Sequence, residues 1–156
     1  MDGGYKVLSF GGFWGLEKSR WRGVATMFIE YFPEGRGDTP MLLLYGRDWE
    51  QCQTLCDCCL HLAEGKVKRV ALNSLPGFEC IGGCQLWGAV AGQDFGVTLP
   101  PGSDKIFECR LTRPVWGHMA ELLQPLCRPQ PEETDIFHTL DRHGAVALVV
   151  STAREW

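Results

Sequence analysis

Residues 41–65 read MLLLYGRDWEQCQTLCDCCLHLAEG and predict a strand that leads directly into a helix. The apolar run 41–45 has the length of a buried strand. Asp48 supplies a carboxylate that can cap the free amides of the first helical turn, and Gln51 completes a variant capping box. Beyond the cap, thiols and apolar side chains recur at helical spacing, and Gly65 is placed to close the helix in a left-handed conformation.

A second strand–helix unit is predicted over residues 105–126. Side chains alternate between apolar and charged along 105–111, which is typical of a half-buried strand. Thr112 is placed to cap the helix that follows, and Pro125 would cost it a backbone hydrogen bond, so we expect the helix to end near Gln124. The side chains expected on the buried stripe of this helix are Trp116, Met119, Ala120, Leu123 and Leu126.

The other regular segments predict strands joined by turns. Residues 24–32 are apolar on both faces, which indicates a central strand, and the polar loop 33–40 connects it to 41–45 as a hairpin. Further strands are expected at 66–72, at 78–90 with an interruption at Gly82 and Gly83, at 95–99, and at 136–140 and 145–150 around a four-residue hairpin loop. We therefore predict an α+β fold, with a mainly antiparallel sheet and two principal helices.

Length and composition narrow the class of protein. A chain of 156 residues with 45% hydrophobic side chains suits one folded domain. We expect residues 1–21 to form an N-terminal arm or irregular segment and residues 22–156 to form a single α+β domain. The net charge of −4 argues against a general nucleic-acid binder. No apolar run approaches the about 20 residues that span a bilayer, and no export signal is recognisable, so we expect a cytoplasmic protein without a membrane partner.

Eight cysteines allow two interpretations. Metal binding would use Cys52, Cys56, Cys58 and Cys59 with Cys80 and Cys84, but neither group has the CxxC spacing of a zinc ribbon. Alternatively, Cys52, Cys56 and Cys59 occupy one helical stripe and serve as small core residues. We favour the second interpretation and predict thiols that are reduced and metal-free, and we assign no metal ligand.

No catalytic or cofactor-binding motif is found. The four histidines show no HExxH pattern, and His138 and His143, on either side of a predicted turn, are typical of exposed turn residues. A Cys/His nucleophilic pair would need only to meet in space, but nothing local favours one. Gly11, Gly12 and Gly15 lack the Lys-Ser/Thr of a phosphate-binding loop. We therefore predict a protein that is not an enzyme and has no cofactor.

Residues 107–156 resemble small bacterial immunity proteins encoded beside polymorphic or type VI secretion toxins. The resemblance lies in Phe107, Cys109 and Leu111 leading into Trp116, in the Leu122–Leu123 and Pro125–Leu126 pairs, in the strands 137–140 and 145–151, and in the final Trp156. It implies a cytoplasmic inhibitor used in bacterial competition. Its partner would be a cognate toxin, a nuclease being one candidate class, encoded by the adjacent gene.

Acidic side chains around the first predicted hairpin are the candidate partner-binding residues. Glu30, Glu34 and Asp38 lie within or beside the long polar loop between two apolar strands. An acidic patch could imitate the charge of a nuclease substrate and speed the encounter with a basic cleft. The alternative for each residue is that it only keeps the hairpin solvated. The rival functions are a small Cys-dependent metal-binding regulator or enzyme, and an adaptor subunit.

Overall fold

The computed structural model describes residues 26–129 and 135–154, so the predicted arm at 1–21 lies outside the described residues. Within these ranges the fold is α+β, as predicted. A five-stranded sheet has the order β4 (Phe78–Cys80), β1 (Met27–Arg36), β2 (Thr39–Tyr45), β9 (Ala147–Ser151) and β8 (Phe137–Asp141). A four-stranded sheet has the order β3 (Arg69–Ala71), β5 (Gln85–Val90), β7 (Ile106–Leu111) and β6 (Gly96–Thr98). The helices are α2 (Trp49–Ala63) and α3 (Arg113–Leu123).

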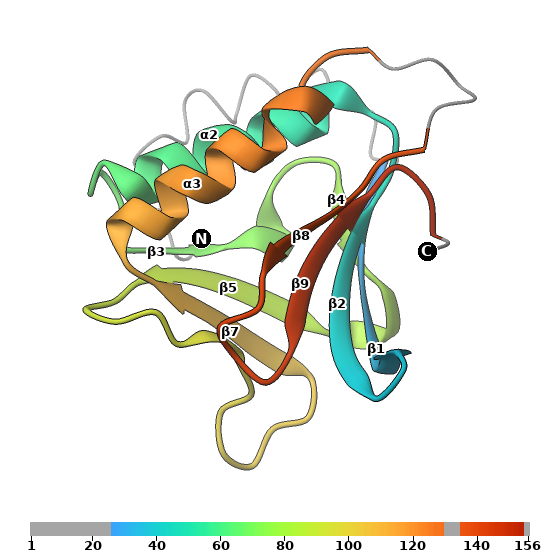
Figure 1. Ribbon diagram of the computed structural model, residues 1–156, viewed down its shortest axis with the longest axis vertical. Coiled ribbons are helices and arrows are strands. Elements are labelled where there is room, and N and C mark those ends of the chain that lie inside the picture. Colours follow the sequence, from blue (N-terminus) through green and yellow to red (C-terminus); the bar gives the residue numbers. More distant parts are fainter. Residues whose placement is uncertain (1–25, 130–134, 155–156) are drawn as a thin grey trace.

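Both sheets are mixed, which corrects part of the predicted topology. Strands pair antiparallel in β1–β2, β8–β9, β3–β5 and β6–β7. They pair parallel in β1–β4, β2–β9 and β5–β7. Strands that follow each other along the chain form the antiparallel pairs β1–β2, β6–β7 and β8–β9, whereas β4 lies between β3 and β5 in the sequence. The parallel partners are separated by longer stretches of chain that return in the same direction. Figure 1 shows the two sheets meeting at an angle beneath the helices.

The β1–β2 hairpin is longer than predicted, and the proposed loop 33–40 is wrong. Strand β1 continues to Arg36, and the turn consists of Gly37 and Asp38. The ladder shifts register between Phe32 and Arg36. Gly35 makes this possible, because a Cβ atom there would lie 2.0 Å from the carbonyl oxygen of Thr39. The glycines thus allow a tight turn in a stretch whose polarity suggested a loop.

The segment 78–90 does not form one interrupted strand. Strand β4 belongs to the five-stranded sheet and β5 to the four-stranded sheet. Between them the 3₁₀ turn η3 (Ile81–Gly83) places both glycines at positive φ, Gly82 at 75° and Gly83 at 78°. The glycine pair expected to interrupt one strand is therefore the point at which the chain changes sheets.

The helix signals are largely confirmed. Asp48 caps α2 by accepting a 3.0 Å hydrogen bond from the backbone amide of Glu50, and Gly65 follows the helix at a φ of 76°. Thr112 stands at the N-cap position of α3, but its side chain makes no cap hydrogen bond and donates to Asp94 instead. Helix α3 ends at Leu123, next to the predicted end at Gln124.

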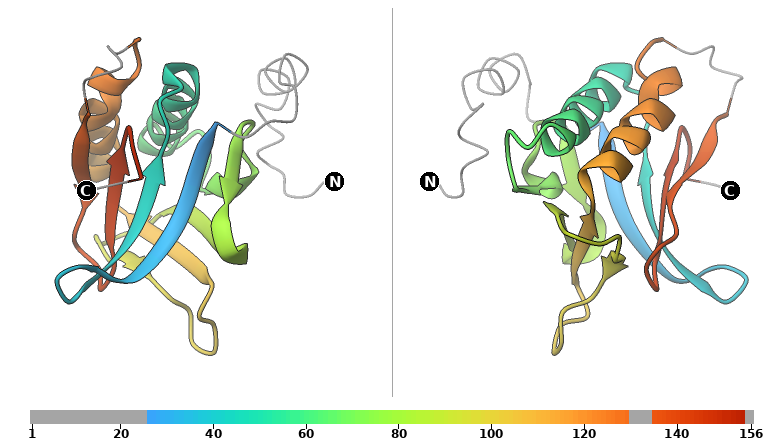
Figure 2. Two further views of the ribbon diagram at one scale, coloured as in Figure 1. Left: turned by 90° about the vertical axis from the view of Figure 1, so that its right-hand side faces the viewer. Right: turned by 60° about the vertical axis from the view of Figure 1, so that its left-hand side comes forward.

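One hydrophobic core joins both helices to both sheets. Helices α2 and α3 lie side by side (Figures 1 and 2), and the predicted stripes of both helices point inward. Trp116 is fully buried, and its indole Nε1 donates a 3.0 Å hydrogen bond to the carbonyl of Ala89 in β5. The neighbouring Gly88 leaves room for the ring, since a Cβ there would lie 3.0 Å from the indole. Helix α3 is thereby fixed to the four-stranded sheet.

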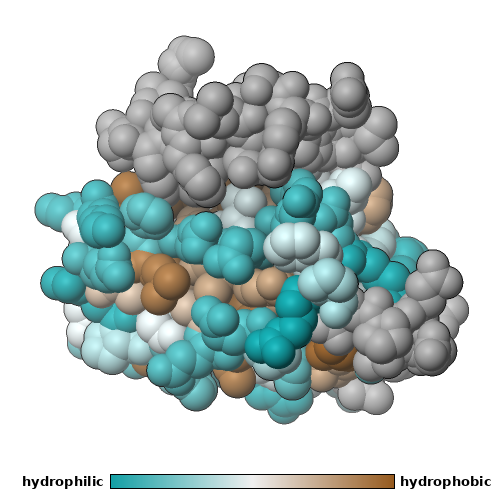
Figure 3. All heavy atoms as spheres, turned by 90° about the horizontal axis from the view of Figure 1, so that it is seen from above, coloured by the Kyte–Doolittle hydropathy of each residue, from teal (hydrophilic) through white to brown (hydrophobic). Residues whose placement is uncertain are grey.

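The outer surface of the helix layer is mostly hydrophilic. Seen from above, a narrow band of hydrophobic side chains runs between hydrophilic ones (Figure 3). Neither α2 nor α3 combines the length and the apolar character needed to cross a membrane.

Replacing Trp116 with Ala should lower the free energy of unfolding by about 3–5 kcal/mol, because the change empties a large space in the shared core. Replacing Trp49, which is 39% exposed, with Ala is the matched control and should change stability by about 0.5 kcal/mol or less. Urea unfolding followed by circular dichroism measures both. Equal losses for the two variants would contradict the assignment of Trp116 as a core residue.

Candidate functional site

The three predicted partner-binding carboxylates occupy two different environments. Glu30 lies in the middle of β1, opposite Leu43 of β2, and its side chain is only 15% exposed. Glu34 and Asp38 lie near and at the turn of the β1–β2 hairpin, and both are exposed. The structure therefore brings Glu34 and Asp38 together on one projecting hairpin, whereas Glu30 belongs to the body of the sheet.

Glu30 is held by an ion pair and a tyrosine. Arg154 donates to both carboxylate oxygens, from Nε at 3.0 Å and from Nη2 at 2.9 Å, and the hydroxyl of Tyr45 donates to Oε1 at 2.9 Å. The Arg154 hydrogen bond lowers the pKa of Glu30 against the opposing effect of burial. Because this charge is already bound, the acidic character available to a partner rests on Glu34 and Asp38.

The sheet face that carries these residues is apolar at its centre. Figure 2 shows this outer face of the five-stranded sheet with no described helix over it. A second hydrophobic cluster, separate from the main core, lies here. Its buried members are Met41, Leu43, Ala147 and Val149, and the partly buried Phe32, Tyr45 and Phe137 pack against them. Sequence reasoning missed this face, although the apolar residues at alternate positions of β2 on both sides were a signal for it.

A pocket of about 100 Å³ opens on the same cluster. It is lined by Thr39, Met41, Phe137, Thr139, Arg142, Ala147 and Val149. Thr39 directly follows the turn residue Asp38, so the pocket begins where the acidic hairpin tip ends. The outer face therefore combines an exposed acidic tip, an apolar centre and a small recess, which we call the hairpin face.

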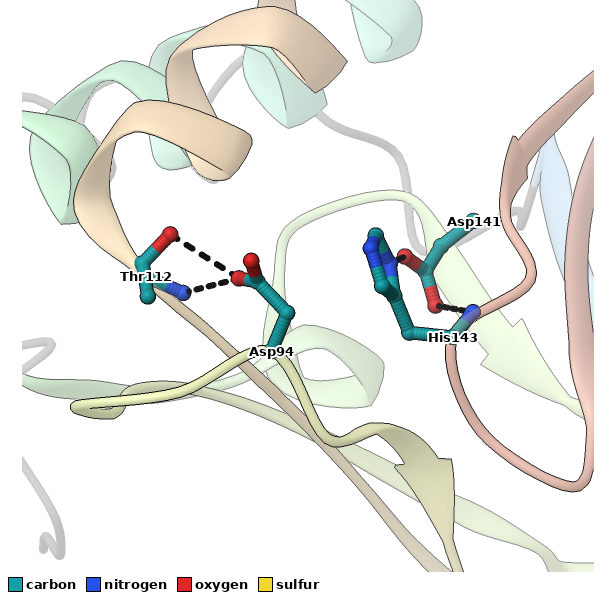
Figure 4. A network of polar contacts seen from close by, with 4 residues as sticks. All are labelled: Asp94, Thr112, Asp141 and His143. Carbon is teal, nitrogen blue, oxygen red and sulfur yellow. Dashed lines mark hydrogen bonds and ion pairs between the residues drawn. The ribbon is translucent and has the colours of Figure 1, made fainter.

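Two hydrogen-bonded pairs, Asp141 with His143 and Asp94 with Thr112, lie next to each other where the β8–β9 turn meets the four-stranded sheet (Figure 4). Asp141 is 4% exposed and accepts hydrogen bonds from the backbone amide of His143 at 3.1 Å and from the ring Nδ1 at 2.5 Å. Asp94 accepts from the amide of Thr112 at 2.8 Å and from its hydroxyl at 2.9 Å. The imidazole lies between the two carboxylates, so a charged ring would interact favourably with both.

Two glycines allow the close approach at this network. A Cβ on Gly96 would lie 2.1 Å from the amide of Gly144, and a Cβ on Gly144 would lie 2.3 Å from the carbonyl of Val97. An isolated bridge also pairs Val97 with Val146 across the two sheets. An imidazole oriented by a buried carboxylate can transfer protons. Here, however, both carboxylate oxygens of Asp141 accept hydrogen bonds from His143 within the β8–β9 turn. We assign this network a structural role, and the Asp-x-His-Gly turn was its sequence signal.

The cysteines lie mainly inside the core. All eight are free thiols, and no three His, Cys, Asp or Glu side chains within residues 26–129 and 135–154 are grouped so that they could hold a metal ion. Burial raises the pKa of Cys58 to about 12 and that of Cys59 well above its usual value. Cys58 is buried although it lies off the predicted stripe. The prediction that the thiols are metal-free remains a prediction.

No protein-family model, curated protein or solved structure matches this chain. The residues and their geometry are therefore the basis for assigning a function.

Stability should decrease with rising pH through the titration of His143. The hydrogen bond to Asp141 raises the pKa of His143 above 6.5 in the folded state. A raised folded pKa contributes stability that is complete below the unfolded value and is lost as the pH rises through the folded value. Wild type should therefore lose stability as the pH rises from about 6.5, and His143→Gln should remove this slope. If the free energies of unfolding of the two proteins changed in parallel between pH 5 and 9, the assignment would be contradicted.

Glu30 should act in the opposite direction. Its folded pKa lies below 4.5, so its contribution is present above that value and is lost as the pH falls through the folded pKa. Replacing Glu30 with Gln should flatten this part of the acid unfolding profile, and Arg154→Ala should flatten it similarly because it removes the same ion pair. The double variant should show no further change. An additive effect in acid titrations followed by fluorescence would show that the two side chains act separately.

Proposed function

We propose that the protein is an immunity protein, a non-enzymatic inhibitor that binds a cognate bacterial toxin effector through the hairpin face. The observation that carries this proposal is the exposed acidic tip, Glu34 and Asp38, on a hairpin that projects beside an apolar sheet face. The resemblance of residues 107–156 to immunity proteins supports it from a different part of the chain. The toxin would be encoded by the adjacent gene and would act in bacterial competition.

The negative charge of the protein and of its hairpin tip indicates which class of toxin it would bind. The chain has a net charge of −4, and the two tip carboxylates are exposed. Such a tip suits a basic cleft of the kind that a nuclease uses to hold phosphates. Electrostatic attraction of this kind mainly speeds association and fixes orientation. We therefore propose a nuclease toxin whose cleft receives the hairpin tip.

The apolar part of the hairpin face would supply the stability of the complex. Partly buried aromatic side chains, Phe32, Tyr45 and Phe137, pack against the apolar cluster, and Phe137 also lines the recess described above. Aromatic residues at the centre of an interface contribute much of its binding energy when water is excluded around them. The ion pair of Glu30 with Arg154 restrains β1 beneath the tip, which would lower the entropy that the hairpin loses on binding.

Binding to the product of a neighbouring toxin-like gene tests the proposal. Wild-type protein should form a stable complex, and Glu34→Lys with Asp38→Lys should slow association about ten-fold and reduce its dependence on salt. The matched control is Glu64→Lys with Glu121→Lys, which changes the net charge equally on the helix side and should leave association near the wild-type rate. Stopped-flow or surface binding kinetics at two salt concentrations measure the rates.

Two outcomes would overturn the proposal at different levels. If both double variants slow association equally, net charge rather than the hairpin tip is responsible. If the neighbouring product does not bind at all and the protein gives no protection to cells that express it, the immunity function is wrong.

A further inference from the structure

Cys80 and Cys84 form a thiol pair at the edge of the five-stranded sheet. Cys80 ends β4 and lies opposite Ile29 of β1 in the parallel ladder. Cys84 follows the η3 turn, and its thiol donates a 3.6 Å hydrogen bond to the carbonyl of Ile29. A hydrogen bond also joins the two thiols to each other. Strand register and a side-chain contact thus independently bring the two cysteines to the same residue of β1.

The two thiols differ in acidity and exposure. The hydrogen bond from Cys80 lowers the pKa of Cys84 against the effect of burial, and the same bond raises the pKa of Cys80. Cys84 is 6% exposed and Cys80 is half-buried. The pair therefore consists of Cys84, the thiol of lowered pKa, and Cys80, the more accessible thiol beside it, and a lowered pKa favours a cysteine as the nucleophile over its resolving partner.

The turn that connects the two cysteines is open to solvent. Gly82 and Gly83 are exposed, and a Cβ on Gly82 would meet nothing within 4 Å. A Cβ on Gly83 would approach only Lys105 Nζ, at 4.0 Å. A small oxidant can reach the turn from solvent, and the glycines allow the backbone to adjust when the two sulfurs approach each other.

We propose that Cys80 and Cys84 are a redox-active dithiol that hydroperoxides oxidise to an intramolecular disulfide. The Cys84 thiolate attacks the terminal oxygen of the hydroperoxide, the O–O bond breaks, and the alcohol leaves with the Cys84 proton. The Cys80 sulfur then attacks the resulting sulfenic acid. The S–O bond breaks, water leaves with the Cys80 proton, and the S–S bond forms. The two thiols lose two electrons, which reduce the hydroperoxide to alcohol and water.

Cys56 and Cys127 form a second pair of interacting thiols, and they serve as an internal comparison. Cys56 is fully buried between the helices, and its sulfur accepts a 3.3 Å hydrogen bond from Gln124 and donates one of 3.5 Å to the carbonyl of Ala120. An oxidant would have to enter the packed helix layer to reach it. We therefore expect this pair to react more slowly than Cys80 and Cys84.

Treatment of the full-length protein with hydrogen peroxide tests the proposal. After denaturation, free thiols are blocked with N-ethylmaleimide and the peptides are mapped by mass spectrometry. Wild type should yield a peptide in which Cys80 and Cys84 are linked, lighter by the mass of two hydrogen atoms. Cys80→Ser should leave a sulfenic acid on Cys84 that dimedone traps. Cys127→Ser is the matched control and should form the Cys80–Cys84 disulfide within about two-fold of the wild-type rate.

Either of two results would overturn the proposal. The first is full maleimide labelling of Cys80 and Cys84 in peroxide-treated wild type, which requires no variant to fold. The second is oxidation of Cys56 and Cys127 before Cys80 and Cys84. Circular dichroism of each variant confirms that it is folded before oxidation is compared.

Discussion

The buried side chain of Trp116 fixes helix α3 to the four-stranded sheet. The indole leaves α3, passes over Gly88 and donates to the carbonyl of Ala89, so one side chain joins the helix layer to the four-stranded sheet. Helix α2 packs beside α3 and contributes its thiols and leucines to the same core. Since β2 leads directly into α2, the five-stranded sheet is attached to this core as well. Both described helices lie on the core side of that sheet, so neither covers its outer face.

The second constraint is the close contact between the sheets on the side of His143. Asp141 fixes the β8–β9 turn, and Gly96 and Gly144 let the backbones approach to a distance that no Cβ would permit. The pair Val97–Val146 closes this contact with backbone hydrogen bonding. Because β9 is held here on one side, its other neighbour β2 and the hairpin beyond it have a fixed support. The hairpin face thus depends on residues that do not belong to it.

Local patterns predicted most of the elements but not their assembly. The Asp48 cap, the strand ending at Leu111 and the stripe around Trp116 follow from spacing alone, and all are observed. The two-sheet arrangement could not be predicted from the sequence, because the chain changes sheets between β4 and β5 at two glycines. In the sequence alone, such a glycine pair is indistinguishable from an interruption within one strand. The pairing of Glu30 with Arg154 could not be predicted either, since 124 residues separate the partners. Sequence reasoning therefore grouped three carboxylates that the fold divides.

Strand β1 connects the two sites proposed for this protein and also keeps them separate. Its first residues pair with β4, where Cys80 lies opposite Ile29, and its far end carries Glu34 toward the hairpin tip. Between these ends β1 pairs continuously with β2 from Phe28 to Phe32, so β1 remains in the sheet without β4. A disulfide at Cys80 would therefore alter the short edge strand while the longer ladder holds the tip in place. The register shift after Phe32 separates the tip further from movements at the edge.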